Sequence, residues 1–224
     1  MKKSYIGLFD VIGPVMVGPS SSHTSGANYI AWMARQIFSG TPVRVSFRLY
    51  RSFADTYRGH GTDRALIGGI LGYRSDDKRI RNAYENAKKA GLKVDFIADA
   101  GTEVNHPNTV DIVMQTEDGH QLLVRGESLG GGRARITRLN DIDVDFTGER
   151  STLIIEQKDE PGVIAFITNT FAKRKMNIAF MRVFRKEDGD RAITVIESDD
   201  FLPEELRDEL SGYQAILNVE AIEL

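Results

Sequence analysis

The residues of this chain best suited to chemistry form a hydroxyl-rich run near the N-terminus. Residues 20–24 read Ser20-Ser21-Ser22-His23-Thr24, so four hydroxyls and one imidazole stand together just ahead of a predicted helix. The free N–H groups at a helix start and the helix dipole favour an anion, and hydroxyls add short hydrogen-bond donors. The run therefore predicts a site for a carboxylate or a phosphate. The alternative is a well-capped helix start, because serine and threonine are enriched there for structural reasons alone.

A second candidate is a histidine between two glycines, in Gly59-His60-Gly61-Thr62, just before another predicted helix. Glycine lets a backbone approach a ligand closely, and an imidazole can exchange a proton near neutral pH. His60 is therefore a candidate general base, with a polar turn residue as the alternative. His23 could serve as a further proton carrier. His106 and His120 lie in loop or turn contexts and are interpreted as structural.

A glycine run follows a predicted strand, in Ser128-Leu129-Gly130-Gly131-Gly132. The backbone N–H groups of such a run can cradle an anion, although the run can equally form a flexible corner. The chain has no G-x-G-x-x-G opening a helix after a strand and no Walker sequence. The usual nucleotide-binding signatures are therefore missing.

The composition excludes several classes of function. The 224 residues carry 29 Lys and Arg against 32 Asp and Glu, so no basic excess indicates a nucleic-acid or membrane partner. There is no cysteine, hence no disulfide framework and no thiolate metal site built from this chain alone. The N-terminal segment lacks the sustained apolar stretch of a signal peptide, and no run of about 18 apolar residues predicts a membrane span. We expect a soluble, cytoplasmic protein.

Hydrophobic periodicity predicts a mixed α+β fold for the first 147 residues. Helices are expected at residues 25–38, 62–71 and 76–90, and strands at residues 43–50, 93–98, 109–116, 121–126 and 136–146. A hairpin turn is expected at Asp118-Gly119. The hydroxyl-rich run is expected to be a loop that leads into the first of these helices.

A second domain is predicted over residues 151–224, after a linker at residues 147–150. Its elements are expected at residues 152–157, 163–173, 178–185, 191–197, 203–210 and 215–223. The order is βαββαβ, which is typical of a ferredoxin-like unit. The sequence therefore predicts two domains, residues 1–147 and 151–224.

The motifs together resemble a known family. The segments at residues 18–24, 60–62 and 128–132, with the opening segment 4–14, resemble the beta chain of iron–sulfur-dependent L-serine dehydratases over about residues 1–147. The second domain resembles an ACT domain, through Asp159-Glu160-Pro161-Gly162-Val163 and Met176-Asn177-Ile178. The first domain is also similar to the intervening domain of some phosphoglycerate dehydrogenases, which binds small anions.

The resemblance implies an L-serine ammonia-lyase that converts L-serine to pyruvate and ammonia. Its [4Fe–4S] cluster is held by cysteines of an alpha subunit, so this cysteine-free chain would be the separate beta subunit, inactive alone and not a cluster ligand. His60 or His23 would be the catalytic base. Substrate contacts are implied at Ser20, Ser21, Ser22, His23, Thr24, Gly61, Thr62, Ser128, Gly130 and Gly131.

The ACT resemblance implies self-pairing and regulation by L-serine or another small amino acid. Effector contacts are implied at Asp159, Gly162, Val163, Asn177 and Ile178. The alternative for this domain is pairing without an effector. For the whole chain, the alternative is a stand-alone or dehydrogenase-associated protein that senses an amino acid or another anion.

Overall fold

The computed structural model describes residues 15–185 and 189–223. The described residues fall into two compact units, one within residues 1–35 and 40–137 and the other within residues 36–39 and 138–224. The motif at residues 4–14 lies outside the described residues. Both units combine helices with β-strands, and consecutive strands pair in antiparallel hairpins, which confirms the predicted α+β class.

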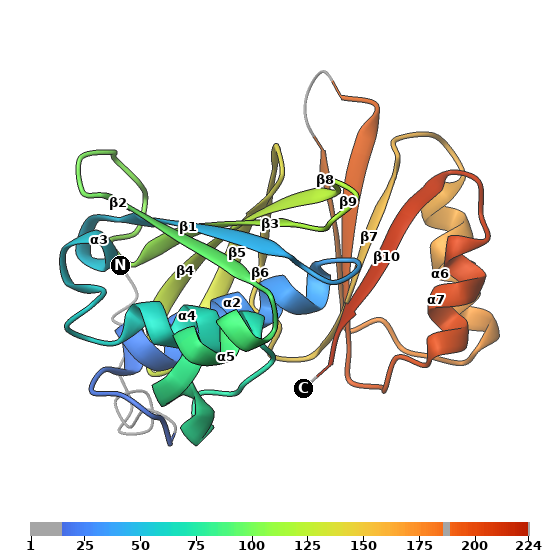
Figure 1. Cartoon of the computed structure of the whole chain (residues 1–224). Helices are drawn as coiled ribbons and strands as arrows, with labels where there is room; N and C mark the ends of the chain where they lie inside the picture. The colour runs from blue at the N-terminus through green and yellow to red at the C-terminus, as the bar shows by residue number, and fades with distance from the viewer. Residues whose placement is uncertain (1–14, 186–188, 224) are drawn as a thin grey trace, which may run out of the picture. The chain divides into compact units, whose positions relative to one another are not determined.

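The first part of the chain builds a mixed six-stranded sheet with helices on one face (Figure 1). The strand order is β2-β1-β3-β4-β5-β6, with β1 parallel to β2 and antiparallel to β3. The elements, in chain order, are η1 (Ser21–Gly26), α2 (Ala27–Ile37), β1 (Arg44–Tyr50), α3 (Arg51–Thr56), α4 (Thr62–Ile70), η2 (Lys78–Asn82), α5 (Ala83–Lys89), β2 (Lys93–Asp99), β3 (Thr109–Gln115), β4 (Gln121–Gly130), β5 (Arg133–Leu139) and β6 (Ile142–Phe146).

One face of this sheet is apolar because every second residue of its central strands is apolar. Phe47 of β1 and Ile112 of β3 lie opposite each other and are fully buried. Gly126 of β4 lies on the same face, opposite Val110. A methyl group placed on Gly126 would come within 2.3 Å of Ile30, so glycine is needed for α2 to pack this closely.

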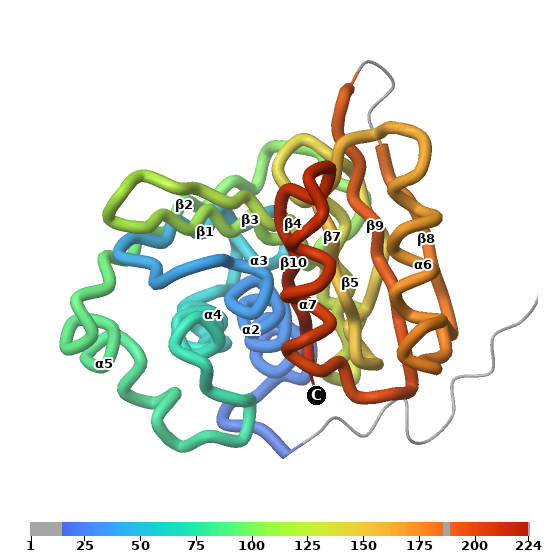
Figure 2. Tube along the Cα trace, turned by 90° about the vertical axis from the view of Figure 1, so that its right-hand side faces the viewer, coloured from blue at the N-terminus to red at the C-terminus, as the bar shows by residue number. Residues whose placement is uncertain are grey.

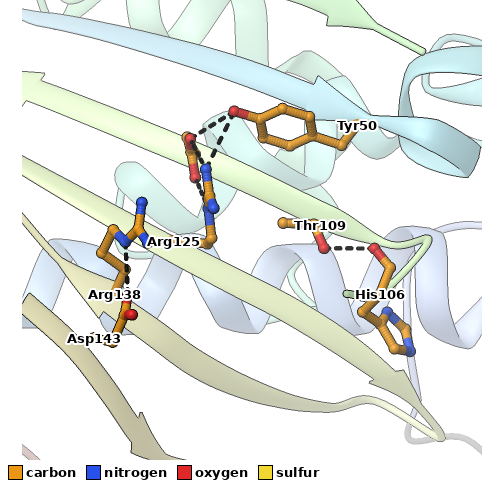
Figure 3. A network of polar contacts seen from close by, with 7 residues as sticks. Tyr50, His106, Thr109, Arg125, Arg138 and Asp143 are labelled. Carbon is orange, nitrogen blue, oxygen red and sulfur yellow. Dashed lines mark hydrogen bonds and ion pairs between the residues drawn. The ribbon is translucent and has the colours of Figure 1, made fainter. Parts of the chain in front are cut away.

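The opposite face carries charged side chains that pair across the strands. Arg125 of β4 donates to both carboxylate oxygens of Asp111 on β3, at 2.6 and 2.7 Å. The hydroxyl of Tyr50, on β1, donates to the same carboxylate at 2.7 Å (Figure 3). Burial and this hydrogen bond raise the pKa of Tyr50 to about 12. The network therefore links three neighbouring strands through one buried carboxylate.

Two predictions about local structure are wrong in detail. The hydroxyl-rich run is not a loop, because residues 21–26 already form a wide helical turn that continues into α2. The predicted helix at residues 76–90 is broken into η2 and α5, since Asn82 has the non-helical angles φ −110° and ψ 27°. Ordinary helix periodicity does not distinguish these tighter and wider turns from an α-helix.

Two further elements differ from the predicted pattern. The strand-like segment 136–146 belongs to two strands, β5 and β6, joined by a turn in which Asn140 has φ 51°. Asparagine tolerates this left-handed conformation better than most residues. Helix α3 was not predicted, because its six residues are too few for a periodic pattern.

The second part of the chain confirms the predicted βαββαβ order. Its antiparallel sheet has the order β10-β7-β9-β8, and α6 and α7 lie side by side on it (Figures 1 and 2). The core between helices and sheet includes Leu153, Ile155, Ile167, Phe171 and Leu206. The elements are β7 (Ser151–Lys158), α6 (Val163–Lys173), β8 (Phe180–Arg185), β9 (Arg191–Ser198), α7 (Glu204–Ser211) and β10 (Ile216–Ile222).

Helix α6 ends in a Schellman motif that uses lysine where glycine is usual. The N–H of Met176 donates to the carbonyl of Phe171 at 3.1 Å, and the N–H of Lys175 donates to Ala172 at 3.0 Å. Lys175 has φ 58° in this motif. A side chain in that left-handed conformation is strained.

Candidate active site

The hydroxyl-rich run lies at the start of η1, the helical turn that continues into α2. The carbonyl of Ser20 accepts from the N–H of Thr24 at 2.8 Å, and the hydroxyl of Ser20 accepts from the N–H of His23 at 3.2 Å. Ser20 is therefore the N-cap, as the structural alternative predicts. Ser21 and Ser22 are partly exposed on the same turn, while Thr24 is buried.

His23 is held between two hydroxyl groups. Its Nδ1 lies 3.1 Å from the hydroxyl oxygen of Ser22, and its Nε2 lies 3.0 Å from that of Ser52 in α3. The ring also meets Phe53 edge-on, at 5.3 Å between centroids. Burial, and secondarily the neighbouring His60, lower the pKa of His23, although the contact with Ser52 opposes the shift. A neutral imidazole, with one donor and one acceptor nitrogen, matches two hydroxyl partners.

His60 lies beside His23, in the turn between α3 and α4. The two rings are 4.8 Å apart, edge to face, at an angle of 73°. The backbone of His60 is fixed on both sides: its N–H donates to Thr56 at 3.0 Å, and its carbonyl accepts from the hydroxyl of Thr24 at 3.1 Å. Its Nδ1 is buried and has no hydrogen-bond partner among the residues that the structure describes. A buried polar atom left unpaired is unusual and costly.

The residues after His60 begin helix α4. Gly61 is its N-cap and has φ 69°, a left-handed conformation that glycine adopts without strain. Thr62 is fully buried, and within the described segments its Oγ1 also lacks a hydrogen-bond partner. His60 and Thr62 therefore place two unpaired polar atoms at one turn.

Ser128 joins this group from β4, far along the chain. Its hydroxyl donates to the carbonyl of Ser22 at 2.8 Å. A methyl group placed on Gly26 would lie 2.0 Å from the same hydroxyl oxygen, so the helix start and β4 are in close contact. The hydroxyl–imidazole cluster is therefore made of Ser20, Ser22, His23, Ser52, His60 and Ser128.

Gly130 ends β4, and Gly131 follows it in the turn to β5. Both have positive φ, 88° and 62°, and the space around a methyl group placed on Gly130 is open to 4 Å. The turn conformation by itself accounts for glycine at these two positions. Of the glycine-run motif, the serine is the part that contacts the cluster.

Sequence reasoning did not identify Ser52 or the turn His106-Pro107-Asn108 as parts of this region. The carbonyl of Pro107 accepts from the N–H of Ser52, and that of Asn108 accepts from the N–H of Ser128, both at 3.0 Å. The turn therefore ties together two residues that contact the hydroxyl-rich run. Figure 3 shows His106 at this turn, where its carbonyl accepts from Thr109 at 2.6 Å. The only available signal was a histidine and an asparagine flanking a proline just before a predicted strand.

Among the described residues, the unpaired polar atoms of this region are an imidazole nitrogen, a hydroxyl oxygen and an amide oxygen. The buried acidic residues of the described chain are occupied: Asp63 accepts from Tyr84, Asp111 from Arg125, and Glu127 from Arg135. Within residues 15–185 and 189–223, no three His, Cys, Asp or Glu side chains gather so as to hold a metal ion. None of the helices in these two segments is long and apolar enough to cross a membrane.

The predicted effector residues fall into two groups in the second part of the chain. Asp159, Gly162 and Val163 lie before or at the start of α6, whereas Asn177 and Ile178 follow its end. An 11-residue helix is about 16 Å long. The N–H of Asn177 donates to Asp200 at 3.0 Å, and its carbonyl accepts from Ser198 at 2.8 Å. One copy of the chain does not bring the two groups together.

Comparisons with known proteins agree with this architecture. The family model of the serine dehydratase beta chain matches residues 7–135, and that of the ACT domain matches residues 151–213. A protein of Bacillus subtilis described as a probable L-serine dehydratase beta chain is 41% identical over 97% of this chain and 98% of its own length. The L-serine dehydratase beta chain of Peptoniphilus asaccharolyticus is 39% identical over 96% of this chain and 97% of its own. The chain belongs to the serine dehydratase beta chain family.

A second, weaker similarity concerns a different enzyme. The D-3-phosphoglycerate dehydrogenase of Bacillus subtilis is 28% identical over 72% of this chain, which corresponds to 30% of the dehydrogenase. The resemblance to that class, expected from the sequence, is therefore present over part of the dehydrogenase.

Proposed function

We propose that the chain is the beta subunit of an L-serine ammonia-lyase, which converts L-serine to pyruvate and ammonia together with a separate alpha subunit in the cytoplasm. Two relatives described as beta chains of L-serine dehydratase align with this chain over nearly its full length. The observation that carries the proposal at the level of residues is the hydroxyl–imidazole cluster, where His23 and His60 lie ring against ring.

In this proposal the hydroxyl-rich turn binds the carboxylate of serine. Ser20, Ser21, Ser22 and Thr24 supply hydroxyl donors at a helix start, where the backbone dipole also favours an anion. Gly61, Thr62, Ser128, Gly130 and Gly131 complete the candidate substrate contacts. The unpaired Oγ1 of Thr62 supports a role in binding, whereas Gly130 and Gly131 have the weakest support, because their turn explains them.

His60 is the better candidate for the base that removes the α-proton. The hydroxyls of Ser22 and Ser52 occupy both nitrogens of His23, so that His23 is suited to orient the turn. Nδ1 of His60, by contrast, has no hydrogen-bond partner in the described part of the chain. A base needs a nitrogen that can accept the proton in the bound complex.

The chain itself does not fit an iron–sulfur cluster, because it has no cysteine and its described residues gather no alternative ligand set. We therefore place the [4Fe–4S] cluster on a cysteine-bearing alpha subunit. When bound there, the cluster would act as a Lewis acid on the substrate hydroxyl. The beta chain alone is then expected to be inactive.

The first test is His60→Ala in the assembled two-chain enzyme. Loss of a general base costs about 10²- to 10⁴-fold in rate, so kcat/KM for L-serine should fall by that factor. His120→Ala is the matched control, since His120 is an exposed histidine at a turn. A His60→Ala enzyme with near-normal kcat/KM would remove His60 from the mechanism.

A second test addresses the carboxylate. Ser21→Ala and Ser22→Ala should mainly raise KM, because they remove donors to a group that does not react. Ser39→Ala changes an exposed serine outside the cluster and serves as the control. Unchanged saturation by serine in both variants would count against carboxylate binding by this turn.

For the second part of the chain, the proposal is an ACT domain that pairs with a second copy and binds L-serine or another small amino acid. Because Asp159, Gly162 and Val163 are separated from Asn177 and Ile178 by the length of α6, pairing of two copies would be needed to bring the groups together. Titration calorimetry of the full chain with L-serine tests this, with Asn177→Ala as the variant. Absence of any heat with serine or related amino acids favours pairing alone.

The proposed domain limits, residues 1–147 and 151–224, have a separate test. Arg150 is exposed and lies in the predicted linker. Limited digestion with trypsin should therefore cut first after Arg150 and leave two resistant fragments. First cuts inside either range would show that the limits are misplaced.

The competing function is an amino-acid or anion sensor without a catalytic partner. The similarity to a phosphoglycerate dehydrogenase favours this alternative. Purification of the chain under anaerobic conditions separates the two. A brown, cysteine-bearing partner that deaminates serine supports the lyase, whereas a lone oligomer supports the sensor.

A further inference from the structure

The turn His106-Pro107-Asn108 carries a buried polar atom that the described part of the fold does not use. Oδ1 of Asn108 has no hydrogen-bond partner among residues 15–185 and 189–223. Leaving a buried acceptor unpaired destabilises a fold. Such an atom is usually paired with a water or a ligand in the working protein.

The backbone around this atom is fully engaged. The N–H of Asn108 donates to Nδ1 of His106 at 3.2 Å, and its carbonyl accepts from the N–H of Ser128 at 3.0 Å. Thr109, which follows, is fully buried and holds the carbonyl of His106. The side chain of Asn108 is therefore carried by a rigid turn.

The turn is attached to the hydroxyl–imidazole cluster at two points. Ser128 donates to the carbonyl of Ser22, and Ser52 bonds to His23. Both serines also donate their backbone N–H groups to the turn, at Asn108 and Pro107. Asn108 thus lies two hydrogen bonds from the residues proposed to bind the substrate carboxylate.

The chemistry of Oδ1 of Asn108 indicates which group of an amino acid it can bind. An amide oxygen only accepts hydrogen bonds, whereas the hydroxyls of the cluster both donate and accept. A carboxylate offers only acceptors, and an ammonium offers only donors. The buried acidic side chains that could otherwise meet an ammonium, Asp63 and Glu127, are paired with Tyr84 and Arg135.

We propose that Asn108 binds the α-ammonium group of the amino-acid substrate through its amide oxygen. This inference rests on the proposed function and adds a specificity-determining residue to it. The hydroxyls of the hydroxyl-rich turn would bind the carboxylate and Asn108 the ammonium, so that the site would recognise both charged groups of an amino acid.

The test compares Asn108→Ala with the wild type in the assembled two-chain enzyme. Three compounds are used: L-serine, L-alanine, which keeps the ammonium, and 3-hydroxypropionate, which is serine without it. KM for serine and Ki for alanine should rise about 10- to 100-fold, the loss typical of a hydrogen bond to a charged group. Ki for 3-hydroxypropionate should stay within about twofold of the wild-type value, because that compound never used Asn108.

Asn105→Ala is the matched control, since Asn105 is an exposed asparagine in the same loop. If KM for serine is unchanged in Asn108→Ala, or if all three compounds bind equally poorly, Asn108 does not recognise the ammonium. A wild-type assembly that neither binds nor deaminates serine overturns the proposed function, and this inference with it. Failure of the inference alone leaves wild-type turnover intact.

Asn108→Asp tests the contact with the ammonium group even if Asn108→Ala fails to assemble. Aspartate keeps an acceptor oxygen in the same place, so serine should bind within a few-fold of wild type. If Asn108→Asp instead loses serine and 3-hydroxypropionate together, the free amide group is a donor to the carboxylate and the assignment to the ammonium is wrong.

Discussion

The contact between Gly26 and Ser128 allows a prediction whose size follows from the structure. In Gly26→Ala, the new methyl group would lie 2.0 Å from the hydroxyl oxygen of Ser128 and 2.9 Å from its Cβ. Relieving such overpacking costs about 1–3 kcal/mol. Displacing Ser128 also removes its hydrogen bond to Ser22, worth about 1 kcal/mol. Alanine regains about 0.5–1 kcal/mol over glycine in a helix, so we expect a net loss of about 2 kcal/mol.

The assay is urea unfolding of the full chain, followed by tryptophan fluorescence. Trp32 is the single tryptophan and lies in α2, directly after the altered turn. Ser128→Gly and the double variant complete a mutant cycle. Once Ser128 has no side chain, Gly26→Ala should cost nothing or stabilise slightly, which gives a coupling of about 2 kcal/mol between the two sites. The reasoning would be refuted if Gly26→Ala were as stable as the wild type. It would also be refuted if the free-energy changes of the two single variants added to that of the double variant within about 0.5 kcal/mol.

Three further predictions concern stability. Lys175→Gly should raise the free energy of unfolding by about 1 kcal/mol, because it relieves the strain of the left-handed conformation at φ 58°. Midpoints of urea unfolding measure this change, and no gain would mean that Lys175 is unstrained. The pKa of His23 lies below its ordinary value of 6.5, so the folded state binds fewer protons than the unfolded state. The fold therefore loses stability at His23 as the pH falls below 6.5. His23→Gln should flatten this loss of stability between about pH 7.5 and pH 5. Asp111→Asn should destabilise the fold by about 3 kcal/mol, since it leaves Arg125 partly buried and without its carboxylate. Tyr50→Phe removes one hydrogen bond and should cost about 1 kcal/mol. Equal losses of stability in thermal unfolding would contradict this order.

The second part of the chain could be predicted nearly residue by residue. Helix α6 begins and ends at Val163 and Lys173, as its apolar spacing predicts, and each strand lies within two residues of its predicted limits. Alternation of period two and amphipathic spacing are local signals. Each element of this unit is long enough to display one of them.

The candidate site was only partly predictable, because its contacts join distant segments. Ser52 is 29 residues from His23, and Ser128 is 106 residues from Ser22. Periodicity carries no information about which segments meet in space. His60 and the hydroxyl-rich run could be found from residue type and glycine flanking, whereas Asn108 becomes noticeable only when its hydrogen-bond partners are counted.

The position of His23 has a consequence for the behaviour of the cluster in acid. Burial lowers the pKa of His23, so placing a proton on its ring costs the folded state free energy. The same ring joins two segments, because it contacts Ser22 of η1 and Ser52 of α3. The cost of protonation therefore falls on the contact of η1 with α3 and the turn that follows it, which the hydrogen bond from Thr24 to His60 also spans. Acid should thus loosen the chain first at this junction.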